Sequence, residues 1–276
     1  MIINARTAPV EREYLFIDGG CLRAAVSKIS KDIFGNDEAY KPLLKSFATP
    51  DFHKIYYYDA IPGRNHNEAQ AAYEARIQPE FERIEKIQML DRVHVALGQI
   101  VGANRRQKGV DVRLAVDMMT QAFRGNITRA TLFAGDADFV PLIEALVAEG
   151  LHVTLWHPPQ ANGQLKRAAD STRLFSFRSD LKCFASDDES PAFFLNPPGG
   201  QSEPPPDAHV VFLGDGRKIA GRWRGNSLVI WVHSGSFFWN TYHLAAPDCT
   251  LQAALRAFDA LVNLGIADTA EQWIQT

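Results

Sequence analysis

Two aspartates, Asp136 and Asp138, stand one residue apart just after an apolar segment, in the stretch FAGDADFVP at 133–141. Each of these like charges raises the cost of ionising the other, so the pair calls for a positive group nearby. A bound metal ion, a basic partner or the N-terminus of the next helix could provide it. The spacing therefore points to chemistry in which carboxylates act together.

Two more aspartates are expected at the same edge of the fold. Asp18 ends the apolar segment at 13–19, and Asp111 begins a helical pattern at 110–125. Ligands of an open parallel sheet gather outside the carboxyl ends of its strands, where the strand order reverses. If the first and fourth strands are neighbours, all four acids converge there. Because Mg²⁺ and Mn²⁺ prefer oxygen ligands, the pattern predicts a site that activates water and stabilises charge on a phosphodiester.

Each of these acids also has a purely structural interpretation. Asp18 could begin a turn, and Asp111 could be a helix N-cap. One aspartate of the pair at 136 and 138 could cap the helix that follows. Asp117 lies six residues beyond Asp111 and points away from it around the helix, so we expect it to be a surface or supporting residue.

The elements that must position these acids can be read from the hydrophobic periodicity. We expect strands at 13–19, 54–60, 93–101, 129–136 and 151–158, helices at 21–35, 67–90, 110–125 and 139–150, and a further helix-like stretch at 163–177. Pro79 should kink or divide the second helix. Strands that alternate with helices predict an α/β fold with a mostly parallel five-stranded sheet covered on both faces.

The composition changes in the last third of the chain. Residues 186–208 are dense in proline, glycine and acids, which indicates a linker between a first domain at 1–185 and a second at 209–276. Short strand patterns separated by turn signals, followed by an amphipathic helix at 250–265, predict a small antiparallel sheet with a helix packed on it.

The bulk properties are those of a cytoplasmic protein. The chain has 276 residues, of which 46% are hydrophobic, and a formal net charge of −3. No segment is typical of a signal peptide or a membrane span. Its three cysteines are far apart and indicate reduced thiols. With this net charge, nucleic-acid binding would need a local basic patch.

One basic segment lies directly before Asp111. It contains the candidate phosphate-binding residues Arg105, Arg106, Gln107 and Lys108. Arg64, in the segment after the second strand, is a weaker candidate of the same kind. A solvated turn is the alternative interpretation of both segments.

The second domain mixes aromatic and basic residues, among them Arg222 and Trp231. Such a surface can bind single-stranded nucleic acid by stacking and phosphate contact. We favour the alternative that the rings form the core of a small domain. A third use is a face for a protein partner or for self-association.

Three segments, in order and spacing, resemble the NYN domain, the LabA-like branch of the PIN superfamily of metal-dependent ribonucleases. They are FIDGG at 16–20, KGVDVRLAVDMM at 108–119 and FAGDADFVPLIEALVAEGLHV at 133–153. The resemblance covers residues 12–160 and implies a PIN-like three-layer αβα sandwich, a Mg²⁺ or Mn²⁺ site and hydrolysis of RNA. It assigns both metal binding and catalysis to Asp18, Asp111, Asp136 and Asp138.

One position departs from the family pattern. Members usually have Asp-Gly-x-Asn after the first strand, and here Cys21 takes the place of the asparagine. A thiol cannot replace the hydrogen-bond donor and acceptor of an amide. We therefore expect a metal-dependent endoribonuclease and keep open a non-catalytic module of the NYN type that binds RNA or a protein. A phosphatase-like fold with Asp18 as nucleophile is disfavoured, because Gly20 stands where a second acid is needed.

Overall fold

The computed structural model describes residues 11–101, 106–187, 189–199, 203–234, 238–247 and 249–273. The chain divides into two compact units. The first consists of the residues up to Ala24 together with Leu44–Phe175, and the second of Ala25–Leu43 together with the residues from Ser176 on. Among the helices of the described ranges, none is both long and apolar enough to cross a membrane. The domain boundaries expected from the sequence stay predictions.

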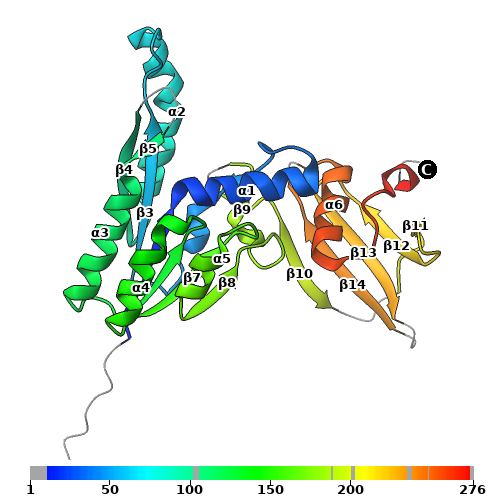
Figure 1. Ribbon diagram of the computed structural model, residues 1–276. Helices are drawn as coiled ribbons and strands as arrows, with labels where there is room; N and C mark the ends of the chain where they lie inside the picture. The colour runs from blue at the N-terminus through cyan, green and yellow to red at the C-terminus, as the bar shows by residue number, and fades with distance from the viewer. Residues whose placement is uncertain are drawn as a thin grey trace, which may run out of the picture. The chain divides into compact units, whose positions relative to one another are not determined.

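The first unit contains a seven-stranded sheet, drawn with its helices in Figure 1. Its strands are β1 (Glu13–Asp18), β3 (Lys54–Pro62), β4 (Val93–Val101), β5 (Arg106–Lys108), β6 (Arg129–Phe133), β7 (His152–His157) and β8 (Ser171–Leu174). Their order in the sheet is β5-β4-β3-β1-β6-β7-β8, and all of them except β5 run parallel. The α/β fold is thus confirmed, with six parallel strands where five were expected.

The sixth parallel strand comes from the segment expected to be helical at 163–177. There the chain forms the short helix α5 (Gly163–Ala168) and then β8, so the prediction of one helix-like stretch was wrong. The β8 segment pairs with β7 through main-chain hydrogen bonds, and this tertiary pairing overrides the local pattern. The basic segment after β4, for which a solvated turn was the alternative interpretation, contains β5, an antiparallel edge strand.

Helices cover both faces of this sheet. They are α1 (Gly19–Phe34), which contributes its residues up to Ala24 to this unit, α2 (Gln70–Gln88), α3 (Val110–Phe123), α4 (Val140–Ala148) and α5. Consecutive residues of β3 show the two layers, because their side chains point to opposite faces. Tyr58 donates a hydrogen bond to Asp117 on α3, whereas Asp59 pairs with Arg83 on α2. The first unit is therefore a three-layer αβα sandwich.

The buried interior of the sandwich is built from the apolar runs of the strands. On the side of α3, α4 and α5, Phe16, Leu114, Leu132 and other fully buried residues form one continuous cluster. On the other side, α2 packs on β3 and β4 and runs through Pro79 without being divided. This interior fixes the strands whose carboxyl ends carry the acids.

The second unit contains a five-stranded antiparallel sheet. Its strands, in the order β10-β14-β13-β12-β11, are β10 (Phe194–Gly199), β11 (His209–Phe212), β12 (Lys218–Trp223), β13 (Ser227–Ser234) and β14 (Phe238–Ala245). A two-stranded sheet of β2 (Lys41–Pro42) and β9 (Phe184–Ala185) and the helix α6 (Leu251–Val262) belong to the same unit. The expected antiparallel sheet and helix are confirmed.

Strand β10 lies inside the segment expected to be a linker. Its prolines are tolerated because β10 is an edge strand, where a missing amide proton breaks no ladder bond. Within the same sheet, Trp231 is 5% exposed and Arg222 lies over its ring, with the guanidinium carbon 5.5 Å from the ring centroid. This tryptophan is a core residue and offers no stacking surface to a base.

Candidate metal centre

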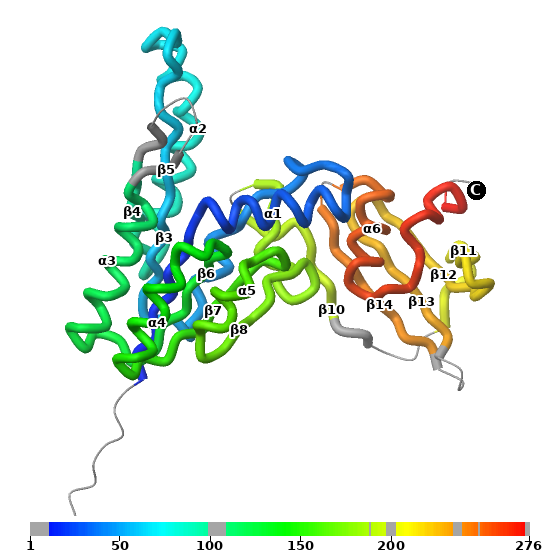
Figure 2. Tube along the Cα trace, viewed as in Figure 1, coloured from blue at the N-terminus to red at the C-terminus, as the bar shows by residue number. Residues whose placement is uncertain are grey.

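The carboxyl ends of β1 and β6 form the centre of the site. These strands are direct neighbours, and the register pairs Ile17 with Phe133, so Asp18 and Asp136 both follow the last paired residues. On one side of β1 the sheet continues with β3 and β4. On its other side it continues with β6, β7 and β8, so strand order reverses at β1. Figure 2 shows β3 and β6 close together, and in the sheet they are the two neighbours of β1.

Hydrogen bonds to the backbone orient both carboxylates. Oδ1 of Asp18 accepts the amide proton of Cys21 in the first turn of α1, at 3.0 Å. Oδ1 of Asp136 accepts the amide proton of Asp138 at 3.1 Å and caps the short 3-10 helix Ala137–Phe139. Capping is thus one role of both residues. Because a carboxylate has about four lone-pair sites, each keeps acceptor capacity for a ligand.

Asp111 reaches the same edge from α3. The N-cap of this helix is Gly109, with φ of 84°, so Asp111 does not hold the capping position. Burial raises the pKa of Asp111, and the nearby charges of Asp136 and Asp138 raise it further. Asp111 is thus near enough to Asp136 and Asp138 to feel their charges, and all three residues are exposed.

Asp18 is the most buried of the four acids. Burial raises its pKa to about 6; hydrogen bonds from the amides of Cys21 and Gly20 oppose this shift, and the charges of Asp111 and Asp59 add to it. No ion pair to any of the four acids is present within the described part of the chain. Among the described residues, these four carboxylates therefore have no cation paired with them, which is the electrostatic setting for a bound cation.

Cys21 lies near both Asp18 and the loop that carries Asp136. A Cβ atom on Gly135, in the loop after β6, would be 3.3 Å from Sγ of Cys21. Burial raises the pKa of the thiol to about 12, and the charges of Asp18 and Asp136 contribute. At neutral pH the thiol is protonated, so Cys21 adds no further negative charge to the site.

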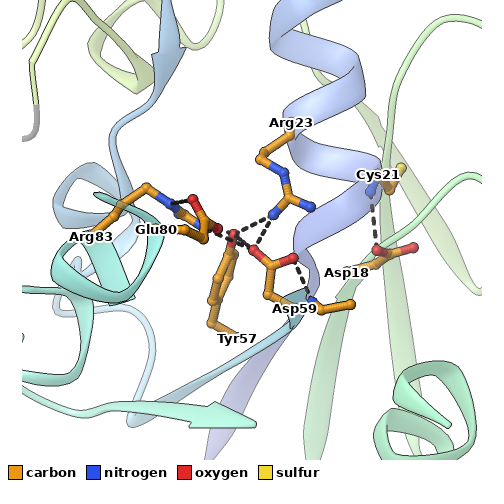
Figure 3. A network of polar contacts seen from close by, with 8 residues as sticks. Asp18, Cys21, Arg23, Tyr57, Asp59, Glu80 and Arg83 are labelled. Atoms are coloured by element: carbon orange, nitrogen blue, oxygen red, sulfur yellow. Dashed lines mark hydrogen bonds and ion pairs between the residues drawn. The ribbon is translucent and has the colours of Figure 1, made fainter. Parts of the chain in front are cut away.

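A fifth carboxylate, Asp59, lies near Asp18 on β3 and is 1% exposed. Unlike the four acids, it is neutralised: Arg23 and Arg83 both pair with Oδ2, Arg83 at 2.9 Å. Tyr57 donates a hydrogen bond to the same oxygen at 2.6 Å. Figure 3 shows this network beside Asp18 and Cys21. Asp59 is thus occupied by protein cations and is not available to a metal.

Sequence reasoning missed this network. The segment YYYDA at 56–60 was predicted as part of a strand, in which Tyr57 and Tyr58 are fully buried. The overlooked signal was the acid itself, because an aspartate inside a buried strand needs a partner. Its partners, Arg23 and Arg83, come from α1 and α2, and nothing in the local sequence pairs them with Asp59.

Carboxylate oxygens suit a hard cation, although the four side chains do not surround a common point in the described structure. As they stand, no three histidine, cysteine or acidic side chains in the described ranges are placed to hold a metal ion together. Mg²⁺ usually binds through one or two carboxylates, with water and substrate phosphates as its other ligands. Two oriented aspartates at the ends of β1 and β6 meet that requirement.

Comparison with known proteins agrees with this architecture. The NYN domain matches residues 14–176, which is more than half of the chain. The chain belongs to the NYN domain family. This is a PIN-like nuclease family whose members usually depend on a metal, and membership implies at most a nucleic-acid substrate. The resemblance inferred from the sequence is confirmed.

Two other comparisons add little to the NYN assignment. A solved structure from Vibrio parahaemolyticus, of a protein of unknown function, has 16% sequence identity and a TM-score of 0.41. The similarity covers 62% of this chain and 96% of that one. No curated protein matches the sequence. The family assignment therefore depends on the match to the NYN domain.

The structure describes only part of the basic residues that were predicted for this NYN protein. Arg105 lies outside the described residues, and for Arg106, Gln107 and Lys108 only the backbone, as strand β5, is described. Arg64 is exposed after β3, and its Nη1 donates to Gln70 at 3.2 Å. A role for these five residues in binding nucleic acid stays a prediction.

Proposed function

We propose that this protein is an endoribonuclease that depends on Mg²⁺ or Mn²⁺. The observation that carries the proposal is the contrast between two sets of carboxylates at one edge of the sheet. Asp59 is neutralised by two arginines, whereas Asp18 and the acids near it repel one another without a basic partner in the described residues. A cation is the group that this second set lacks.

In this proposal Asp18, Asp111, Asp136 and Asp138 would hold the ion, which requires their side chains to close around it, because no three of them are placed to do so in the described structure. When bound, such an ion lowers the pKa of a coordinated water and stabilises the charge that develops on a phosphodiester. The amides of Cys21 and Asp138 fix the carboxylates of Asp18 and Asp136 in orientation before any ligand arrives. Asp111, Asp136 and Asp138 are exposed, so a strand could approach them from solvent.

RNA is the substrate that we propose within the nucleic acids that the family allows. The test compares cleavage of end-labelled RNA by the wild type and by Asp136→Asn, each with Mn²⁺ and with EDTA. Asp91→Asn is the matched control, because Asp91 precedes β4 at the opposite edge of the sheet and its side chain is 89% exposed. We expect cleavage only with the metal, and only by the wild type and the control. Activity in EDTA, or undiminished activity in Asp136→Asn, would exclude the proposal.

A second function has two specific observations in its favour. Cys21 replaces the amide found in related sequences, and the acids are not yet arranged as a closed set of ligands. A non-catalytic module that binds RNA or protein would show both features. Such a module would bind RNA without degrading it and would be unaffected by Asp138→Ala, so the same cleavage assay distinguishes the two functions.

A further inference from the structure

Arg23 is a cation fixed beside the acidic site. Its Nη1 pairs with the buried Oδ2 of Asp59 and approaches the hydroxyl of Tyr57 at 3.3 Å. In the portion of the chain that the structure describes, every hydrogen bond and ion pair of the Arg23 side chain is made by Nη1. The side chain is 37% exposed, so Nε and Nη2 keep hydrogen-bonding capacity toward solvent.

The position of Arg23 relative to Asp18 follows from the helix. Asp18 is the last residue of β1, Gly19 begins α1, and Arg23 lies about 6 Å further along the helix axis. Figure 3 shows the Arg23 guanidinium and the Asp18 carboxylate beside the same end of α1. Arg23 therefore lies in the part of α1 that begins at the edge of the sheet carrying the acids.

A polyanion that approaches four carboxylates needs positive charge on both sides of the reacting group. An ion held by the acids would offset the scissile phosphate, but the neighbouring phosphates would still be repelled. Guanidinium groups suit these phosphates because their planar fork of donors matches the oxygen geometry. A side chain that is already held in place also loses less conformational entropy on binding.

We propose that Arg23 binds a backbone phosphate of the RNA strand next to the scissile bond, with Asp59 as the residue that positions it. This inference depends on the proposed function for the identity of the strand. Arg83 is the second cation on Asp59, but it is only 15% exposed and also pairs with Glu80 at 2.5 Å. Of the two arginines, Arg23 is the one with donors left for a ligand.

The test measures binding of a labelled single-stranded oligoribonucleotide as a function of salt concentration. Asp136→Asn serves as the background, so that the strand stays intact, and a gel confirms this. Adding Arg23→Gln should weaken binding about tenfold at low salt, as expected for one charge-assisted contact. It should also reduce the slope of log K against log salt by about 0.7, the value for one phosphate on a single strand.

Arg129→Gln is the matched control. Arg129 begins β6, at the opposite edge of the sheet, its side chain is 39% exposed, and it pairs with Glu13 at 3.7 Å. Removing this charge should leave affinity and slope unchanged. Equal losses in both variants, or no loss in Arg23→Gln, would overturn the inference. If Arg23→Gln does not fold, Arg23→Lys should keep the slope and lose several-fold in affinity, and unchanged affinity would overturn the inference equally.

The positioning role of Asp59 has its own measurement. Asp59→Asn should weaken RNA binding in the Asp136→Asn background and should have no further effect once Arg23→Gln is present. Additive losses would show that Asp59 acts independently of Arg23. The proposed function fails by a different result. If the wild type binds RNA through Arg23 and does not cleave it, only the proposed activity is contradicted. If the wild type cleaves RNA and Arg23→Gln leaves binding unchanged, only this inference is contradicted.

Discussion

Replacing Asp59 by asparagine should destabilise the protein far more than neutralising a surface acid does. The carboxylate of Asp59 is 1% exposed and accepts from Arg23, from Arg83 at 2.9 Å and from the Tyr57 hydroxyl at 2.6 Å. Asparagine has nearly the same shape, so no cavity forms. The substitution removes the charge and leaves two guanidinium groups beside a neutral amide.

The magnitude follows from the burial of the partners. Removing one member of a buried ion pair costs about 3–5 kcal/mol, because the remaining charge is left without compensation. Arg23 can turn toward water, since it is 37% exposed, whereas Arg83 is 15% exposed and keeps its pair with Glu80. Because both arginines can be compensated in this way, we expect a loss of unfolding free energy near the lower end of that range, at about 3 kcal/mol.

Urea unfolding followed by far-UV circular dichroism measures this loss. With a slope of about 2 kcal/mol per molar urea, the midpoint should fall by about 1.5 M. Glu80→Gln is the control, because Glu80 is 29% exposed and its pair with Arg83 should contribute less than about 1 kcal/mol. A loss in Asp59→Asn that does not exceed the loss in the control would refute the view that a buried charged network holds α1 and α2 to β3.

Three further predictions concern other parts of the chain. Because the folded protein raises the pKa of Asp18 to about 6, the metal-free protein binds this proton more tightly than the unfolded chain does. Its stability should fall by up to about 3 kcal/mol as the pH rises from 4 to 6, and Asp18→Asn should reduce that fall in urea titrations with EDTA. Gly221→Ala would place a Cβ against the ring of Trp273 and should cost about 2 kcal/mol, whereas Gly214→Ala, which meets open space, should change thermal stability by less than about 0.5 kcal/mol. The thiol of Cys21, with its pKa raised to about 12, should react slowly with iodoacetamide at pH 8 and faster in Asp18→Asn, as followed by mass spectrometry; rapid alkylation of the wild type would contradict the assigned environment.

The parallel sheet and the position of Asp18 and Asp136 at the ends of neighbouring strands could be predicted from the sequence. Apolar strands that alternate with helices require crossover connections, and those connections place Asp18 and Asp136 at one edge whenever β1 and β6 are neighbours. The structural role of Asp136 as a cap was among the alternatives, and its hydrogen bond to the amide of Asp138 shows it. These features depend on the local hydrophobic pattern and on the sheet topology, and both can be inferred from a single sequence.

Other features depend on pairing between distant segments and could not be predicted in this way. Strand β8 is only four residues long, and its hydrogen bonds to β7 decide its conformation. Strand β10 was hidden by the prolines and glycines around it, which are compatible with an edge strand. The partners of Asp59 lie on two different helices, so the network exists only after the sheet and both helices have assembled.

The central claim is that the acids at the ends of β1 and β6 bind a divalent cation. The most direct measurement is anomalous diffraction from crystals of the protein soaked in Mn²⁺. The account predicts a peak about 2.1 Å from a carboxylate oxygen of Asp18 or Asp136, which disappears in Asp136→Asn. A well-ordered site without such a peak, at a Mn²⁺ concentration that supports cleavage, would contradict the claim.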